Sequence, residues 1–281
     1  MTYDKTSKAV GYNDSAHTYT NLKTGKRYES VTTLIKRFTP DFNGEYWATY
    51  KSVKDVLEKT GQWWKYKKKA GGWENVVDFF NKTSTQLHPA QLEDISFRKE
   101  AYLQNWREEG RIANIKGSAI HEELEAAAHH AKYIKQGIIN YEVTQEDILA
   151  VQDFTSDRIY PELLIHNDEF MVAGQGDKIF KEGNKVDVHD YKTYKKMEHE
   201  GFRGETLLAP LTHLQNANYW KTALQLSMYG WMLEELGYEV RDLFMHWIRG
   251  KDKEDKERNH SVETYKLPYL RDEVITLMLN K

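Results

Sequence analysis

The sequence predicts an α+β domain with a helical elaboration near its N-terminus, and three observations support this fold class. Strand-type residues flank the tight-turn pair Gly183-Asn184, and two further strand-type runs lie at residues 243–248 and 262–267. Residues 43–135 show mostly helical periodicity, and residues 218–236 form a strongly amphipathic helical pattern. Because no internal repeat or low-complexity tract is visible among these elements, we expect one domain over residues 1–281.

The composition indicates a globular protein and excludes several kinds of site. Hydrophobic residues make up 40% of the chain and aromatic residues 13%, which is ample for a core. The net charge of -3 does not indicate nucleic-acid binding, although 30% charged residues leave room for local basic surfaces. The absence of cysteine excludes disulfides, thiolate zinc sites and cysteine-ligated iron–sulfur clusters.

The sequence also bears on location. Residues 1–12 lack the apolar core of a signal peptide, and no apolar run approaches the ~20 residues of a membrane span. We therefore expect a cytoplasmic protein without a membrane partner.

Residues 1–40 are predicted to form a short β entry that leads into a helix. Strand-type residues lie on both sides of Thr24-Gly25, which predicts a turn. Ser30, Thr32 or Thr33 would cap the helix that follows. Alternatively, these hydroxyls and the amides of the helix terminus would hold a phosphate.

One stretch of the helical region 43–135 has two interpretations. Residues 61–73, GQWWKYKKKAGGW, interleave basic and aromatic side chains. Such a stretch can contact phosphates and stack on unpaired bases. It is also typical of a solvated helix end whose tryptophans reach into the core.

A helix over residues 117–137 carries a histidine with two possible roles. Helical spacing places His121 and Glu125 on one side of this helix. The zinc-protease signature needs a second histidine where Glu125 stands, so we exclude that activity. Taken alone, His121 is either a hydrogen-bonded structural residue or a metal ligand.

Three further helices are expected. Residues 144–147, TQED, form a variant of the capping box and open a helix that Pro161 ends. The helix at residues 218–236 presents a polar stripe of residues spaced by four, Lys221, Gln225 and Tyr229. Tyr229 is alternatively a tyrosine at the edge of the core. A closing helix is expected at residues 271–280.

The hairpin around Gly183-Asn184 is predicted to hold a metal ion. A two-residue turn at this pair places Asp177 directly opposite Asp190. Opposed Cβ atoms lie only about 5 Å apart, and like charges so placed destabilise a sheet. A divalent cation would relieve this repulsion.

Lys192 follows Asp190 by two residues, so both side chains leave the same face of their strand. The hairpin therefore combines a metal site with a neighbouring lysine. The alternative is an unrelated Asp-x-Lys sequence, in which Asp190 meets Lys192 in solvent and Asp177 caps a turn. Apolar Val186 and Val188 precede Asp190 on its own face, and this favours the first interpretation.

Four motifs in order resemble the PD-(D/E)XK nuclease superfamily, most closely its RecB-like exonuclease branch. They are Gly117-Ser-x-x-His121, Gly174-x-Gly-Asp177, Asp190-x-Lys192 and Gln225-x-x-x-Tyr229. The resemblance covers roughly residues 98–267, and Ser30-Val31-Thr32 is similar to a further motif of some members. It implies a restriction-endonuclease-like core over residues 98–281, with a mixed central sheet flanked by helices. Residues 1–97 would then be the β entry and the helical elaboration.

The resemblance also implies roles for individual residues. The metal ligands would be His121, Asp177, Asp190 and the backbone carbonyl of Tyr191. Asp177, Asp190 and Lys192 would be catalytic. Gln225 and Tyr229 would support the site or bind DNA.

The implied activity is metal-dependent hydrolysis of DNA phosphodiester bonds, with attack from an end favoured, in recombination, repair or processing. Mg²⁺ or Mn²⁺ suits the implied ligands, and no iron–sulfur cluster is expected. The expected partners are DNA that is single-stranded or has free ends, and a helicase, single-strand-binding or annealing protein. The alternatives are a structure-selective or sequence-specific endonuclease, a DNA-binding module with a degenerate site, and a metallohydrolase of small phosphate esters.

Overall fold

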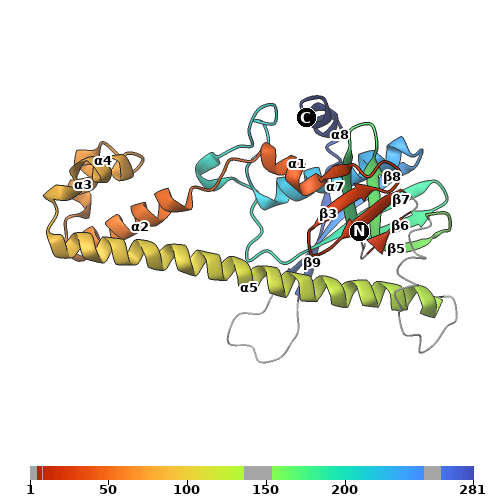
Figure 1. Ribbon diagram of the computed structural model, residues 1–281, viewed down its shortest axis with the longest axis horizontal. Coiled ribbons are helices and arrows are strands. Elements are labelled where there is room, and N and C mark those ends of the chain that lie inside the picture. The colour runs from red at the N-terminus through yellow and green to blue at the C-terminus, as the bar shows by residue number, and fades with distance from the viewer. Residues whose placement is uncertain (1–4, 8, 136–153, 250–260) are drawn as a thin grey trace. The chain divides into compact units, whose positions relative to one another are not determined.

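The computed structural model of the protein describes residues 5–7, 9–135, 154–249 and 261–281 (Figure 1). The chain folds into two compact units. Unit 1 comprises Met1–Pro40 and Gly117–Lys281, and unit 2 comprises Asp41–Lys116. The division expected at residues 97/98 lies inside helix α5 (Pro89–Lys135), and the first 40 residues share unit 1 with the predicted core. The assignment of the whole chain to one nuclease domain stays a prediction.

Unit 1 contains a mixed sheet flanked by helices, which agrees with the expected α+β class. The sheet follows the order β1-β2-β3-β4-β6-β7-β8-β9, and β5 pairs with β6 outside this path. Its strands are β1 Lys5–Thr6, β2 Val10–Asn13, β3 Thr18–Asn21, β4 Arg27–Ser30, β5 Arg158–Asn167, β6 Val172–Glu182, β7 Lys185–Lys192, β8 Glu239–Arg249 and β9 Ser261–Leu267. The β4–β6 and β7–β8 pairs are parallel, and the other pairs are antiparallel.

The β6–β7 hairpin has the predicted turn and register. Glu182 pairs with Lys185 across Gly183, whose φ of 57° is the left-handed value that this turn requires. The ladder continues to Lys178, which pairs with His189. The register agrees with the predicted one, and Asp177 and Asp190 are the first residues beyond the last pair of this ladder.

The structure corrects the helix expected to end at Pro161. Residues 144–153 lie outside the described residues, but Arg158–Asn167 forms strand β5 rather than the end of a helix. Strand β5 pairs only with β6 in the described part of the sheet, and an edge strand tolerates the missing N–H of proline. Tyr160 and Ile165 on this strand are buried in the core, and this burial favours the strand over a local helix.

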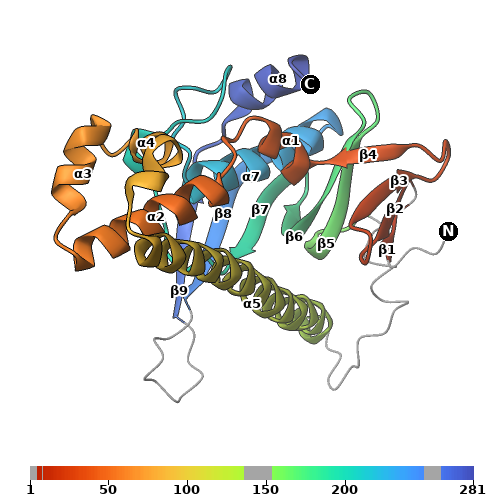
Figure 2. The ribbon, with the colours of Figure 1, turned by 60° about the vertical axis from the view of Figure 1, so that its left-hand side comes forward.

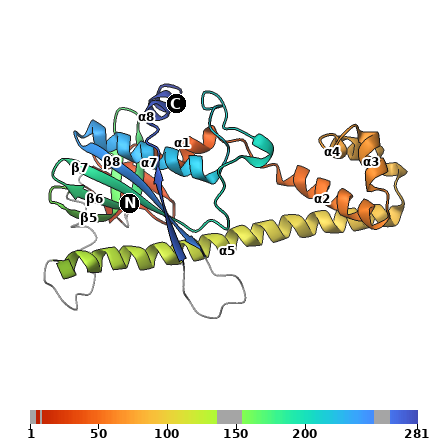
Figure 3. The same ribbon diagram turned by 180° about the vertical axis from the view of Figure 1, so that it is seen from behind.

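Three helices gather over one face of the sheet (Figure 2). They are α1 Val31–Arg37, α7 Asn218–Glu235 and α8 Arg271–Leu279. Helix α7 packs on β7 and β8 (Figure 3), and its buried residues, which include Leu224, Leu226, Met232 and Tyr229, lie on almost every side of the helix. This packing fixes Gln225 and Tyr229 of the predicted polar stripe relative to β7.

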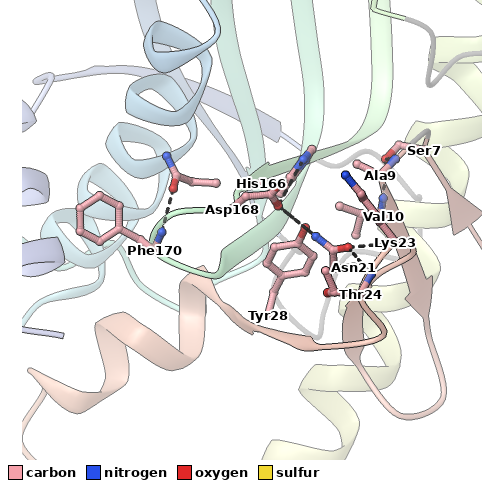
Figure 4. A network of polar contacts seen from close by, with 11 residues as sticks. Ser7, Ala9, Val10, Asn21, Lys23, Thr24, Tyr28, His166, Asp168 and Phe170 are labelled. Atoms are coloured by element: carbon pink, nitrogen blue, oxygen red, sulfur yellow. Dashed lines mark hydrogen bonds and ion pairs between the residues drawn. The ribbon is translucent and has the colours of Figure 1, made fainter.

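A polar network joins the N-terminal strands to the β5–β6 connection (Figure 4). Tyr28 on β4 donates a hydrogen bond from its hydroxyl to Asp168, and Asn21 donates from Nδ2 to the Tyr28 hydroxyl at 2.7 Å. The Tyr28 hydroxyl and the Asn21 amide, both on buried residues, therefore have hydrogen-bond partners within the protein. The network holds the β3–β4 hairpin against the strand pair that carries Asp177.

Unit 2 is helical. Its elements are α2 Gly44–Lys59, α3 Trp63–Ala70, α4 Val76–Thr83, the 3₁₀ turn η1 Ser84–Gln86 and the first part of α5. Val53, Leu57, Trp63 and Ile95 form its core. Unit 1 has one further 3₁₀ turn, η2 Phe202–Gly204. None of the helices in the described ranges is long and apolar enough to cross a membrane.

Candidate metal centre and active site

A cavity of about 480 Å³ opens where strands β4 and β7 separate along one edge of β6. On this edge β4 pairs with Val172 and Ala173, whereas β7 pairs with residues 178–182. Residues 174–177 lie between the two pairings, and Gly174, Gln175 and Asp177 line the cavity. Because β4 and β7 leave this part of β6 unpaired, the polar end of the Gly-x-Gly-Asp motif lines the cavity.

Three carboxylates lie in a row across β5, β6 and β7 at this cavity. The register in which Pro161 and Leu163 pair with β6 places Glu162 opposite Asp177, and Asp177 and Asp190 are the residues that follow the last β6–β7 pair, Lys178 and His189. Glu162 has a φ of 50°, an uncommon and strained value for a residue with a side chain. The sequence predicted the pair Asp177 and Asp190, and the structure adds Glu162 from the neighbouring strand β5.

Helix α5 adds a nitrogen donor to this row. His121 Nδ1 lies 3.4 Å from Asp177 Oδ2. One ligand atom from each of His121, Glu162 and Asp177 can be chosen so that all three lie within 4.8 Å of one another. Burial lowers the pKa of His121, so the ring is neutral near pH 7 and able to coordinate a cation. These half-buried residues therefore have the composition and spacing of a metal site.

The electrostatics of the row favour a bound cation. Burial raises the pKa of Asp177 well above its ordinary value, and the neighbouring Asp190 and Glu162 raise it further. The Tyr191 N–H donates to Asp177 Oδ2 at 2.7 Å and offsets part of this cost. Two carboxylates and an imidazole suit Mg²⁺ or Mn²⁺, so the residues present fit the cofactor that the family resemblance implies.

Asp190 is held by two side chains. Lys192 Nζ lies 2.7 Å from Asp190 Oδ2, and Gln225 Nε2 donates to Asp190 Oδ1 at 3.3 Å. Only 1% of the Asp190 side chain is exposed, and among the described residues its Oδ2 has no partner with hydrogen-bond geometry. Burial alone would lower the pKa of Lys192, but Asp190 raises it above its ordinary value, so the lysine is charged. A charged ammonium therefore lies at the end of the carboxylate row.

The polar stripe of α7 supports this arrangement. Gln225 Nε2 also contacts the Tyr229 hydroxyl, at 3.2 Å. The Tyr229 ring packs so closely on β6 that a Cβ at Gly174 would lie 2.5 Å from its Cε1. Burial raises the pKa of Tyr229 well above its ordinary value, so the phenol keeps its proton. Tyr229 is thus at the core edge and lines the cavity at once.

The N-terminal hairpin supplies cavity residues that sequence reasoning missed. The Tyr12 hydroxyl donates to Asp14 Oδ1 at 3.0 Å and lies 2.9 Å from His17 Nδ1. Tyr19 is only 4% exposed and lines the cavity, and its hydroxyl has no hydrogen-bond partner among the described residues. Burial and the nearby Glu162 raise the pKa of Tyr19, so its hydroxyl is a free donor near the carboxylates.

The start of α1 borders the same cavity. Ser30 Oγ accepts a hydrogen bond from the Thr33 N–H at 3.1 Å, which confirms the predicted cap. Ser30 and Thr32 line the cavity. A phosphate contact at these hydroxyls stays a prediction.

The structure brings most of the predicted site residues to this one cavity, namely His121, Asp177, Asp190, Lys192, Gln225 and Tyr229. Tyr191 contributes its N–H to Asp177, and its carbonyl as a metal ligand stays a prediction. Metal coordination by Asp190 stays a prediction too, since Glu162 rather than Asp190 completes the group around His121. Glu162 was missed because the sequence around Pro161 was interpreted as the end of a helix. The one signal for it was an acidic residue directly before the apolar run Leu163–Ile165.

Comparisons with known proteins found no match to this chain among family models, curated proteins or solved structures. The function is therefore inferred from the cavity, its donor set and its charges. Every residue that lines the cavity belongs to unit 1, so the candidate site lies within that unit.

Proposed function

We propose that this chain is a divalent-metal-dependent deoxyribonuclease with a PD-(D/E)XK-type core. One observation carries the proposal: a three-donor group, His121–Glu162–Asp177, lies beside the buried Asp190–Lys192 ion pair in one cavity. Negatively charged donors alone would suit many cation sites. A charged lysine among them suits a substrate that brings its own negative charge, such as a phosphodiester.

In this proposal, different residues bind the metal ion and stabilise the transition state. When bound, Mg²⁺ or Mn²⁺ would supply Lewis acidity and lower the pKa of a water molecule. His121, Glu162 and Asp177 would hold the ion, and Asp190 stands opposite Asp177 on the next strand. Lys192 would orient the attacking water or stabilise the additional negative charge on the phosphate in the transition state.

Other groups would position the substrate. The free hydroxyl of Tyr19 can donate to a phosphate oxygen. Gln225 holds Asp190 in place through its Nε2 and so fixes the carboxylate that pairs with Lys192. Attack from a DNA end, and a role in recombination, repair or processing beside a helicase, single-strand-binding or annealing protein, are proposed from the family resemblance. A cytoplasmic location is proposed on the same basis.

Digestion of labelled substrates tests the activity. The protein is incubated with 5′- and 3′-labelled single- and double-stranded linear DNA, with circular DNA and with a generic phosphomonoester, each with Mn²⁺, Mg²⁺ or EDTA. We expect metal-dependent release of short products from linear DNA and no action on the phosphomonoester. Cleavage of circular DNA would instead indicate the endonuclease alternative. Hydrolysis of the phosphomonoester alone, or tight DNA binding without any cleavage, would overturn the proposal.

A further inference from the structure

Helix α3 in unit 2 separates the two interpretations of the basic and aromatic stretch. Trp63 is only 3% exposed and belongs to the core of unit 2, as expected for a tryptophan that anchors a helix. Trp64, its neighbour, is 73% exposed. A large indole ring in solvent does not contribute to the stability of this core. Core packing therefore accounts for one tryptophan of the pair and leaves the other unexplained.

Helix α3 carries four lysines besides this exposed ring. Lys67 Nζ lies 5.2 Å from the centroid of the Trp64 ring, within the range of a cation–π contact. Lys65, Lys68 and Lys69 are exposed, and the helix contains no acidic residue. None of these four lysines forms an ion pair with any residue in the described part of the chain, whereas Lys54 on α2 and Lys99 on α5 each do.

Helix stability explains part of this charge. Lys67, Lys68 and Lys69 occupy the last turn, where cations interact favourably with the helix dipole. The dipole does not explain Lys65 in the first turn or the exposure of Trp64. The helix dipole would also act on lysines that are paired with carboxylates, so it does not explain why these four lysines form no ion pair.

We infer that α3 is a binding surface for single-stranded nucleic acid, separate from the cavity of unit 1. These four ammonium groups, none of which forms an ion pair among the described residues, match a phosphate backbone, and the indole offers a flat face on which an unpaired base can stack. Bases in a duplex are already stacked on each other, so the exposed ring favours a single strand. The choice of nucleic acid as partner takes its support from the proposed function, but the surface itself lies in unit 2.

Binding measured without cleavage tests this inference. Fluorescence anisotropy with a labelled oligo-dT is recorded in EDTA for the wild type and for Trp64→Ala, with Phe97→Ala as the matched control because Phe97 is 74% exposed. Loss of one stacked base corresponds to about a 5- to 150-fold weaker affinity, and this is the effect expected for Trp64→Ala. Phe97→Ala is expected to bind like the wild type.

A second set of variants tests the charges. Lys65, Lys68 and Lys69 are replaced together by alanine, and the control replaces the exposed Lys23, Lys26 and Lys36 of unit 1. Removing three phosphate contacts lowers the slope of log affinity against log salt by about 2 for single strands, and we expect this only for the α3 variant. Equal losses in both triple variants, unchanged binding by Trp64→Ala, or preference for anionic lipid vesicles over oligo-dT would overturn the inference. Because EDTA prevents cleavage, these results are independent of whether the cavity hydrolyses DNA.

Discussion

Lys192 Nζ lies 2.7 Å from Asp190 Oδ2, and both side chains leave the same face of β7. Only 1% of Asp190 and 17% of Lys192 is exposed. Burying such a pair contributes little to stability by itself, because each ion loses its hydration. In the proposed function this ion pair lies where Lys192 would act on the phosphate of the substrate.

Replacement of Lys192 should separate catalysis from binding. Loss of one preorganised electrostatic partner typically costs ~100- to 1,000-fold in rate, and we expect this defect for Lys192→Ala in single-turnover cleavage. Affinity for Mn²⁺ and DNA should be nearly unchanged, because an ammonium group cannot bind a metal. Lys195→Ala is the matched control, since Lys195 is an exposed lysine on the same segment.

Circular dichroism must first show that the Lys192 variant is folded, since Asp190 loses its partner. Normal cleavage combined with weak DNA binding would make Lys192 a phosphate clamp rather than a catalytic residue. Tyr229→Ala should show the opposite pattern from Lys192→Ala, with impaired DNA binding or positioning.

The donor group predicts which variants weaken metal binding. His121→Ala and Glu162→Gln should each lower Mn²⁺ affinity about 10-fold or more in calorimetric titration, because each removes one of three donors. His213→Ala is the control. His213 Nε2 lies 3.0 Å from Glu273, so it is also a histidine paired with a carboxylate, but in the described structure no third donor joins it. Equal effects of His121→Ala and His213→Ala would return His121 to a structural role.

Asp177→Asn should stabilise the metal-free protein at neutral pH. The pKa of Asp177 is raised in the folded state, so its contribution to stability is fully present below the unfolded pKa and is lost as pH rises through the folded pKa. At pH 7, which lies above the pKa of this carboxyl in the unfolded chain, the raised pKa lowers the stability of the fold, and asparagine removes this cost because it has no proton to titrate. Differential scanning calorimetry in EDTA should show a higher midpoint for the variant.

Two controls accompany this measurement. Asp187→Asn on the same strand pair should lower the midpoint, because Asp187 accepts two hydrogen bonds from Arg241. Mn²⁺ at 100 times its dissociation constant should stabilise the wild type by about 2.7 kcal/mol and the Asp177 variant by less. A lower midpoint for Asp177→Asn in EDTA would show that the carboxylate row is not strained.

Tyr19→Phe should impair the substrate step alone. A hydrogen bond to a charged group is worth about 1.5–3 kcal/mol, so loss of the hydroxyl should lower kcat/KM roughly 10- to 100-fold. The affinity for Mn²⁺ should stay at the wild-type value, since the phenol is not among the donors. Unchanged kcat/KM would remove Tyr19 from the proposed set of substrate contacts.

Local rules predicted the part of the site that one hairpin builds. The Gly183-Asn184 turn and strict alternation fix the register, so Asp177, Asp190 and Lys192 could be placed from sequence. The polar stripe of α7 was predicted for the same reason, because helical spacing is also local. Its contact with Asp190 through Gln225 depends on tertiary packing and required the structure.

Non-local pairing hid the rest. Glu162 joins the row only because β5 pairs with β6, and Pro161 made a local helix end the more natural interpretation. Tyr19 on β3 pairs with β4, and β4 joins the sheet by pairing with β6. The β4–β6 contact consists of two residue pairs, and sequence periodicity gives no sign of it. The neighbouring Trp63 and Trp64 have the same residue type, and only packing shows that one is buried and the other exposed.

The measurement that tests the central proposal most directly is nucleotide release from end-labelled DNA by the wild type and by Asp177→Asn, each titrated with Mn²⁺. We predict that the wild type cleaves only when Mn²⁺ is present and that the folded variant is inactive at every metal concentration. Asp177 belongs to the donor group with His121 and Glu162, and it is the carboxylate at the centre of the row, between Glu162 and Asp190. Undiminished cleavage by the folded variant, or wild-type cleavage in EDTA, would contradict the proposed site.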